Sequence, residues 1–241
     1  MSNIVPLNSQ AHRDLRVAAV ASARYGDNRH FVQAAVNEFP LLAARCPIFF
    51  AKDGETGAFY CGAMLVFEEG ENLFLKEGEG FEGHRPLNLQ RDPFYVSGAE
   101  LAIDLDSPRV GAPDGEALFT EAGEPTPYLQ SIMAAFRDLK PGLERTKVFI
   151  ATLLELKLIE PVDINVGFDD GTTRDLVGLY TVNQAALAAL PDAAVLDLFR
   201  RGYLYLIHLM IASMKQIPVM GEKKNRRLLD GSSALMVGAQ G

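Results

Sequence analysis

The sequence has few of the residues that build metal and redox sites. It contains two cysteines and four histidines in 241 residues. Cys46 and Cys61 form no C-x-x-C pair, no two histidines stand at metal-ligand spacing, and H-E-x-x-H is absent. These absences argue against zinc and dithiol chemistry, and the sequence predicts no bound metal.

Motifs for nucleotide and nucleophile chemistry are also missing. There is no Walker motif and no G-x-S-x-G. The letters G-x-G-x-x-G occur at Gly78, Gly80 and Gly83, but they run into HRP rather than into an amphipathic helix. The sequence therefore predicts no cofactor.

The two cysteines allow two interpretations, since Cys46 and Cys61 lie in or beside predicted strands. If those strands pair, a disulfide could form between them. The favoured interpretation is two reduced and buried thiols in a cytosolic protein.

Long apolar runs are absent as well. The most apolar stretch, 202–214, holds 13 uncharged residues, whereas a membrane-spanning helix needs about 20. It predicts a core helix over 202–217 that Pro218 ends, covered on most sides by the sheet or by a second subunit of a homo-oligomer. His208 within it is predicted to be a core histidine. The N-terminal segment lacks a continuous apolar core and a small-residue cleavage site, so we expect a cytoplasmic protein without a membrane span.

The balance of charge is acidic, with a formal net charge of −8. Such a chain repels phosphate backbones, so we expect no nucleic-acid partner. The dense basic cluster KKNRR at 223–227 is interpreted as a solvated tail. Contact with an anionic partner is the alternative.

The N-terminal half predicts an antiparallel sheet with long loops. Short apolar runs with strand formers alternate with turn clusters of Gly, Pro and Asp. The predicted strands are CPIFFAKD and AFYCGAMLVFEEGE, joined by a hairpin loop from Asp53 to Gly57, followed by NLFLKEGEG, PFYV and ELAIDLD.

The C-terminal half predicts mainly helices. Thr126-Pro127 suits a helix start, and Pro141 then marks a kink or a break. A hairpin follows, with its turn at 169–171, and further helices begin near Asn183 and Pro191. No linker of convincing length divides the chain. We therefore expect one α+β domain over 1–241, with a core at about 17–228 and a frayed tail at 230–241.

One ten-residue phrase, G-E-x-L-F-x-x-x-G-E, occurs twice, starting at Gly70 and at Gly115. Each copy predicts a small strand followed by a polar turn, because Gly78 and Gly123 can adopt positive φ at little steric cost.

These copies stand in a longer series of phrases. The others are EFPLLAARCPIFFAKD, RDPF, LAIDLDSP, LIEPVDINV, LVGLYTV and ALAALPDAAVLDLFRRGYLYLIHLMIASMKQI. In order and spacing the series resembles the SapC-like family of bacterial proteins, from about Val17 to Leu228.

The resemblance implies a setting rather than a chemistry. The family is named for a surface-layer-associated protein, and its genes often stand beside those of outer-membrane receptors and flavin-dependent halogenases. We therefore expect a non-enzymatic binding or accessory protein of a bacterial envelope or nutrient-uptake pathway, acting with a protein partner or a small anionic ligand. The alternatives are an enzyme, or an enzyme partner, acting on a small metabolite or an amino-acid side chain, and a surface-layer structural subunit.

One acidic pair could serve the enzyme alternative. Asp104 and Asp106 point to one side if IDLD is a strand, and paired carboxylates can carry acid–base catalysis or bind calcium. The calcium-loop spacing is broken by Pro108. Surface acidity is the favoured interpretation.

The segment from Lys76 to Phe94 is the predicted functional site. It is long, polar and interrupted by glycines, and such loops often carry function. Its donors are His84, Arg85, Asn88, Gln90 and Arg91, of which His84, Arg85, Asn88 and Arg91 are the predicted ligand-binding residues. Donors in an acidic surround suit a carboxylate or a phosphate. The competing explanation is that the two arginines only neutralise the glutamates at 77, 79 and 82.

Overall fold

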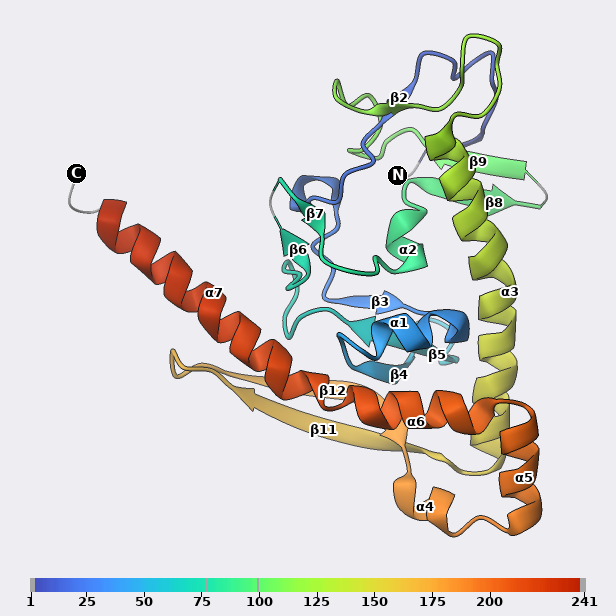
Figure 1. Cartoon of the computed structure of the whole chain (residues 1–241), viewed down its shortest axis with the longest axis vertical. Coiled ribbons are helices and arrows are strands. Elements are labelled where there is room, and N and C mark those ends of the chain that lie inside the picture. Colours follow the sequence, from blue (N-terminus) through green and yellow to red (C-terminus); the bar gives the residue numbers. More distant parts are fainter. Residues whose placement is uncertain (1–2, 77, 99, 239–241) are drawn as a thin grey trace.

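The computed structural model describes residues 3–76, 78–98 and 100–238, without the side chains of Ser97 and residues 230–238. It confirms the α+β class, with antiparallel sheets from the N-terminal half packed against helices of the C-terminal half (Figure 1). The extent of the domain stays a prediction. The backbone of 230–238, where a frayed tail is predicted, lies in the last helix.

The largest sheet has five antiparallel strands in the order β11-β12-β4-β5-β3. They are β3 (Phe31–Gln33), β4 (Ile48–Lys52), β5 (Phe59–Met64), β11 (Ile159–Gly167) and β12 (Thr173–Val182). Both predicted hairpins form, β4–β5 around the loop 53–57 and β11–β12 around a turn in which Gly171 has φ 81°. The C-terminal hairpin thus completes a sheet that the N-terminal half begins.

Three smaller sheets accompany the large one. Strands β1 (Ile4–Pro6), β9 (Glu100–Asp104) and β8 (Phe94–Ser97) form one in the order β1-β9-β8. Strand β2 (Arg16–Val17) pairs with β10 (Glu116–Ala117), and β6 (Leu75–Lys76) pairs with β7 (Gly80–Phe81). In the β1-β9-β8 sheet, β8 is an edge strand.

Helix α3 (Pro127–Glu155) runs alongside both groups of sheets (Figure 1). Thr126 caps it as predicted by accepting a hydrogen bond from Leu129 N, and Pro141 lies inside one continuous helix rather than at a break. The N-terminal half of α3 buries Leu129 and Ile132 with the small sheets, and its C-terminal half buries Phe149 against the large one. This helix therefore joins two apolar cores.

Shorter helices and a long C-terminal helix complete the fold. They are η1 (Ala23–Tyr25), η2 (Val36–Glu38), α1 (Phe39–Leu42), α2 (Leu87–Gln90), α4 (Gln184–Ala188), α5 (Asp192–Arg200), α6 (Tyr203–Ser213) and α7 (Gln216–Gly238). Asn183 caps α4 by accepting from Ala186 N, and Gly202 lies after α5 with φ 73°. The cap at Asn183 agrees with the helix start expected there, and glycine adopts the positive φ at position 202 at little cost.

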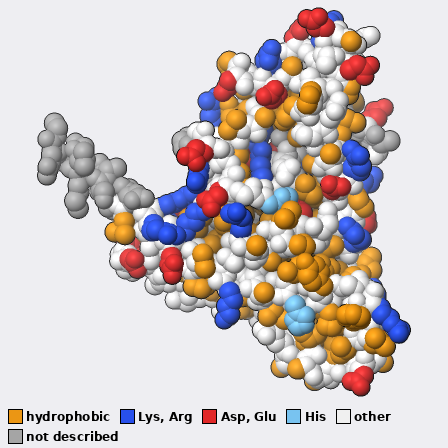
Figure 2. Space-filling view, viewed as in Figure 1, with side chains coloured by type: hydrophobic (Ala, Val, Ile, Leu, Met, Phe, Trp, Pro, Cys, Tyr) orange, Lys and Arg blue, Asp and Glu red, His pale blue; other side chains and the backbone are white. Residues whose placement is uncertain are grey.

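Helix α6 is buried along one stripe only, which corrects the expectation of burial on most sides within the chain. Ile207, Met210 and Ser213 are buried, but Tyr205 is 57% exposed. His208 is exposed, so the prediction of a core histidine is wrong. Figure 2 shows hydrophobic side chains gathered over this lower part of the molecule. Covering of this face by a second subunit stays a prediction.

The apolar helix also does not end at Pro218. The chain turns at Met214 and Lys215, and α7 begins at Gln216, so Pro218 falls in the first turn of a new helix. A proline is tolerated there because the first amides of a helix have no intrahelical acceptor. The stretch Tyr203–Leu229 is long and apolar enough to cross a membrane by length and composition alone, which is weak support because a core helix passes the same test.

The basic cluster of α7 is bound to the body of the protein, so its interpretation as a solvated tail is wrong. Lys223 Nζ lies 2.7 Å from a carboxylate oxygen of Glu82, and Lys224 Nζ lies 2.7 Å from Glu68 and 2.5 Å from Glu71. Its anionic partner is therefore the acidic segment 68–82 of the same chain. The guanidinium of Arg227 donates to the carbonyls of Asn72, Leu73 and Leu75 at 2.8–2.9 Å.

Each copy of the repeated phrase forms hydrogen bonds that hold a helix in place. The first copy, 70–79, supplies Glu71 and the backbone carbonyls that hold α7. The second supplies the carbonyls of Ala117 and Leu118, which accept from Thr126 at the start of α3. Gly78 and Gly123 have φ of 73° and 82°, as predicted for the turns.

Both cysteines are free and buried. Burial is the main cause that raises the pKa of Cys46 to about 12, with the charge of Glu38 adding to it, and burial also raises the pKa of Cys61. Since the thiolate is the reactive form, these are inert thiols.

Candidate functional site

A hollow of about 990 Å³ lies where the large sheet, the segment 88–98 and helix α3 meet. It is called the cleft below. Strand β3 and the β4–β5 hairpin contribute one wall, α2 and β8 contribute a second, and the face of α3 from Phe136 to Ile150 contributes the third. Such a volume is at the upper end of the range for ligand sites.

Much of the cleft lining is apolar and aromatic. These lining residues include Phe31, Phe59, Tyr60, Tyr95, Phe136, Leu139, Leu143 and Ile150. The ring of Phe31 packs edge-on to Tyr60 with centroids 6.1 Å apart, and this ring requires a glycine at position 62 because a Cβ there would lie 2.1 Å from it. Burial is the main cause that raises the pKa of Tyr60, so this hydroxyl stays neutral at pH 7.

Arg91 lies in the wall of the cleft and is held by neighbours that carry no negative charge. Its Nε donates to Asn88 Oδ1 at 2.9 Å, and its Nη1 donates to the Phe94 carbonyl at 2.9 Å. The guanidinium carbon lies 5.1 Å from the ring centre of Tyr95. Asn88 in turn donates to the carbonyl of Gln33 at 2.9 Å. Among the described residues no carboxylate lies within 4.0 Å of Arg91, so its charge is positioned but not neutralised by them.

Three lysines add to the positive charge of the cleft. Lys52 lies over the rings of Phe59 and Tyr180, 5.0 and 5.2 Å from their centres. Lys140 is exposed, and within the described residues neither it nor Lys52 has a carboxylate within 4.0 Å. Lys147 pairs with Glu144 at 2.8 Å.

Two carboxylates offset part of this charge. Besides Glu144, the cleft is lined by Asp53, which accepts from the amide and the hydroxyl of Thr56. These hydrogen bonds lower the pKa of Asp53. Four cations and two carboxylates line the cleft, so it carries net positive charge in a protein whose formal net charge is −8.

His84, the first of the four predicted site residues, contacts a buried carboxylate instead of lining the cleft. Its Nε2 lies 3.1 Å from Oε1 of Glu38, whose side chain is 2% exposed. Glu38 also accepts from the amides of Leu87 at 2.7 Å and of Ala35 at 3.1 Å. His84 and Glu38 therefore tie η2 to the start of α2.

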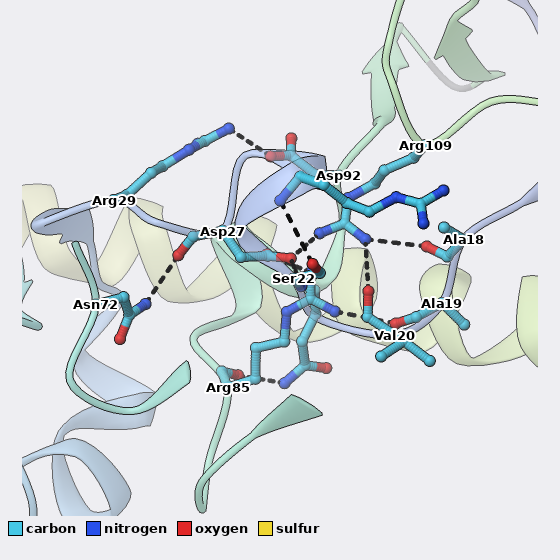
Figure 3. Close-up of polar contacts among 12 residues, drawn as sticks. Ala18, Ala19, Val20, Ser22, Asp27, Arg29, Asn72, Arg85, Asp92 and Arg109 are labelled. Atoms are coloured by element: carbon cyan, nitrogen blue, oxygen red, sulfur yellow. Dashed lines mark hydrogen bonds and ion pairs between the residues drawn. The ribbon is translucent and has the colours of Figure 1, made fainter. Parts of the chain in front are cut away.

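Arg85 belongs to a second buried cluster (Figure 3). Its Nη2 lies 2.7 Å from Oδ1 of Asp27, while Arg109 pairs with the other oxygen of the same carboxylate. Asp27 and Arg109 are each 1% exposed. Arg109 also donates to the carbonyls of Ala18 and Val20 at 3.0 and 3.2 Å. This cluster fixes the segment 18–27 to the loop that carries Arg109.

Burial dominates the pKa shifts around this cluster. It lowers the pKa of Arg85, which the charge of Asp27 counteracts. It raises the pKa of Tyr128 to about 12, although Arg109 and Arg85 act in the opposite direction. The two guanidiniums share the carboxylate of Asp27, although the Nε atoms of Arg85 and Arg109 are buried without a hydrogen-bond partner in the described chain. We read this as a structural ion cluster, because removing one member would leave a buried charge unpaired.

The structure therefore divides the predicted site. Asn88 and Arg91 line the cleft, whereas His84 and Arg85 face buried carboxylates; the segment is not a plain loop, since it contains β7 and α2. Within the described residues, no glutamate of 77–82 pairs with either arginine: Glu79 pairs with Lys76, and Glu82 with Arg45 and Lys223. Glu77 lies outside the described residues. Whether any of the four binds a ligand stays a prediction.

The acidic pair at 104 and 106 lies outside the cleft lining. Asp104 Oδ1 accepts from the amides of Asn3 at 2.8 Å and Asp106 at 3.1 Å, which makes it a cap for the turn after β9. Across the described residues, no cluster of three His, Cys, Asp or Glu side chains could hold a metal ion.

Most of the cleft escaped sequence reasoning. Lys52 lies at the end of β4, and Lys140 and Lys147 lie on α3; their nearest sequence neighbours do not distinguish them from ordinary surface lysines. One signal was available: Phe136, Lys140, Leu143 and Lys147 recur at helical spacing and form a mixed stripe on α3.

Comparison with known proteins gives a family and no further relative. A search of the curated proteins and a search of the solved structures each found no match. A scan against protein-family models matches residues 7–220 to SapC, which is most of the 241-residue chain and agrees with the resemblance in the sequence. The chain belongs to the SapC family.

Proposed function

We propose that this protein is a binding protein whose cleft holds an anionic partner with an apolar body. The observation that carries the proposal is that Lys52, Arg91 and Lys140 line an aromatic hollow and pair with no carboxylate in the part of the chain that the structure describes. An anionic group would gain from these cations in a partly desolvated setting, and an apolar body would cover the rings.

Binding is favoured over catalysis by what the cleft holds. Its lining contains no histidine and no cysteine among the described residues. The residues that could serve an enzyme, His84 and the pair Asp104 and Asp106, lie elsewhere. From the family resemblance we propose an accessory role in an envelope or nutrient-uptake pathway. The cytoplasmic location stays an expectation from the N-terminal sequence.

The test uses 8-anilinonaphthalene-1-sulfonate, an aromatic anion, as the probe. Arg91→Ala/Lys140→Ala should weaken its binding at least tenfold, about 1.4 kcal/mol, in a fluorescence titration at low ionic strength. Lys215→Ala is the control, because Lys215 is an exposed lysine outside the cleft, next to the apolar face of α6.

An unchanged affinity in the double variant would contradict the proposal, provided that its thermal midpoint matches that of the parent. Equal weakening by Lys215→Ala would also contradict it, because the probe would then report general surface charge or the α6 face. Binding should fall with added salt, since the cations of the cleft are open to solvent.

A further inference from the structure

The cleft is bordered by an unpaired edge of β8. The amide of Asp104 donates to the carbonyl of Pro93, so residues 93, 95 and 97 face β9 by the alternation of an antiparallel ladder. The backbone groups of Phe94 and Val96 therefore face away from β9. Both groups of Phe94 are bonded to Arg91: the Phe94 amide donates to the Arg91 carbonyl at 2.6 Å, and the Phe94 carbonyl accepts from Arg91 Nη1 at 2.9 Å.

Val96 is the residue left open on this edge. It is 40% exposed and lines the cleft. Within the described part of the chain, no hydrogen bond involves its amide or its carbonyl. An unpaired N–H and C=O on an edge strand form a template for another strand.

Strand β5 offers a second open position on the opposite wall. The amide of Ala34 donates to the carbonyl of Cys61, and the amide of Leu65 donates to the carbonyl of His30. Residues 61 and 63 of β5, and Leu65 just after it, therefore face β3. By the same alternation Phe59 faces that side too, but β3 has ended and the chain has turned into η2. Phe59 lines the cleft, and its backbone groups are without a partner among the described residues.

We propose that the partner in the cleft is an extended peptide segment that pairs with the backbone of Val96 on β8. This inference rests on the proposed function of the cleft and specifies the occupant. Addition of a strand to a sheet edge is a known mode of peptide recognition, in which backbone hydrogen bonds contribute affinity and alternate side chains contribute specificity. Phe59 supplies further backbone groups on the facing wall.

The chemistry of the cleft determines which peptide fits. Alternate side chains of a strand point to opposite faces. One set would cover the rings of Phe31 and Tyr60 on the large sheet, and the other would meet the charges of Arg91 and Lys140. The segment therefore alternates acidic with apolar or aromatic residues, which complements the net positive charge of the lining.

The probe is a capped hexapeptide of alternating glutamate and phenylalanine, titrated by isothermal calorimetry against the full chain. Two N-methylated versions, one methylated on the glutamate amides and one on the phenylalanine amides, keep every side chain and remove backbone donors. At least one of them should bind at least tenfold more weakly than the parent peptide. Equal binding by all three, or no binding by the parent peptide, would overturn the proposal.

A matched pair of protein variants tests the same edge from the other side. Val96→Pro removes an amide that is not part of the β8–β9 ladder, and prolines are tolerated on edge strands. Val96→Ala keeps the amide and removes most of the side chain. We expect the affinity for the hexapeptide to be at least tenfold lower in Val96→Pro than in Val96→Ala, with the thermal midpoint of both variants unchanged.

The outcomes separate this inference from the proposed function. In one outcome, the N-methylated peptides bind as tightly as the parent peptide, and Val96→Pro binds the hexapeptide as tightly as the parent protein. If Arg91→Ala/Lys140→Ala nevertheless lowers the affinity for both the dye and the hexapeptide, the strand pairing is overturned and the anion site stands. If that double variant binds the dye and the hexapeptide as tightly as the parent protein does, both the anion site and the strand pairing are overturned. If Val96→Pro lowers the thermal midpoint, the N-methylated peptides on the parent protein decide.

Discussion

The two ends of the segment 84–91 contain the same kinds of side chain in opposite settings. At one end His84 and Arg85 contact Glu38 and Asp27, carboxylates that are 2% and 1% exposed. At the other end Arg91 lies on a tyrosine ring and an amide oxygen, in the wall of a cleft. An arginine beside a buried carboxylate cannot be removed without leaving that carboxylate unpaired, whereas an arginine held by neutral groups keeps its charge available to a ligand.

The same contrast extends over the molecule. Lys223 and Lys224 pair with glutamates of the segment 68–82, as Arg85 pairs with Asp27. Arg91 and Lys140 have no such partner in the described chain. In a chain with an excess of acidic residues, cations without carboxylates are the ones to examine for binding.

The largest effect should come from the centre of the buried cluster. Asp27→Asn leaves Arg85 and Arg109 without their shared carboxylate, and breaking a buried ion pair costs about 3–5 kcal/mol. We expect the free energy of unfolding to fall by that amount in urea denaturation. Asp114→Asn, an exposed aspartate, serves as the control and should stay within about 0.5 kcal/mol. If Asp27→Asn lowers the free energy of unfolding by less than about 1 kcal/mol, this cluster contributes no more than an exposed ion pair does.

Removing the carboxylate below His84 should have the next largest effect. Glu38→Ala leaves the buried amides of Ala35 and Leu87 without an acceptor, at about 1–3 kcal/mol each. Thermal and urea unfolding should both report the loss, with Glu55→Ala, an exposed site, as the control. Parent-like stability would mean that His84 is free to serve a ligand after all.

The smallest effect concerns the pH dependence of the α7 contacts. Hydrogen bonds from Lys224 and then Arg174 lower the pKa of Glu68 below its ordinary value of 4.5, and Lys223 does the same for Glu82. A carboxylate with a lowered folded-state pKa stabilises the protein above its unfolded-state pKa, and this contribution is lost as pH falls through the folded-state value. The thermal midpoint should therefore drop below about pH 4.5, and less steeply in Lys223→Met/Lys224→Met. Equal slopes would show that these pairs contribute little.

The fold could be predicted from local signals because turns and caps are local. The turn at 169–171, the caps Thr126 and Asn183, and the glycines of the repeated phrase all lie where neighbouring residues require them. His208 could not be placed this way. A helix that is apolar on all sides suggests burial, but only the packed structure shows which stripe faces the sheet.

The sequence indicated only part of the candidate site, because the contacts that decide the rest are long-range. The density of donors in 84–91 marks a segment, yet Asp27, Glu38 and Arg109 decide which donors are taken, and they lie far away in the sequence. The lysines of the cleft come from β4 and α3, which tertiary packing alone brings beside Arg91. Long-range pairing of charges leaves no periodic trace in one sequence.

The most direct test compares Arg85→Ala with Arg91→Ala in one experiment that measures urea stability and dye affinity for each. If the two arginines have the roles described, Arg85→Ala lowers the free energy of unfolding by about 3–5 kcal/mol because it breaks a buried pair. Under conditions where it is folded, its affinity for the dye stays within about twofold of the parent, a free-energy difference of about 0.4 kcal/mol. Arg91→Ala should instead keep the stability within about 1 kcal/mol, the usual net contribution of a hydrogen bond, and weaken the dye several-fold. The reverse pattern, or equal losses of both properties in both variants, would contradict the division between a structural arginine and a ligand-facing one.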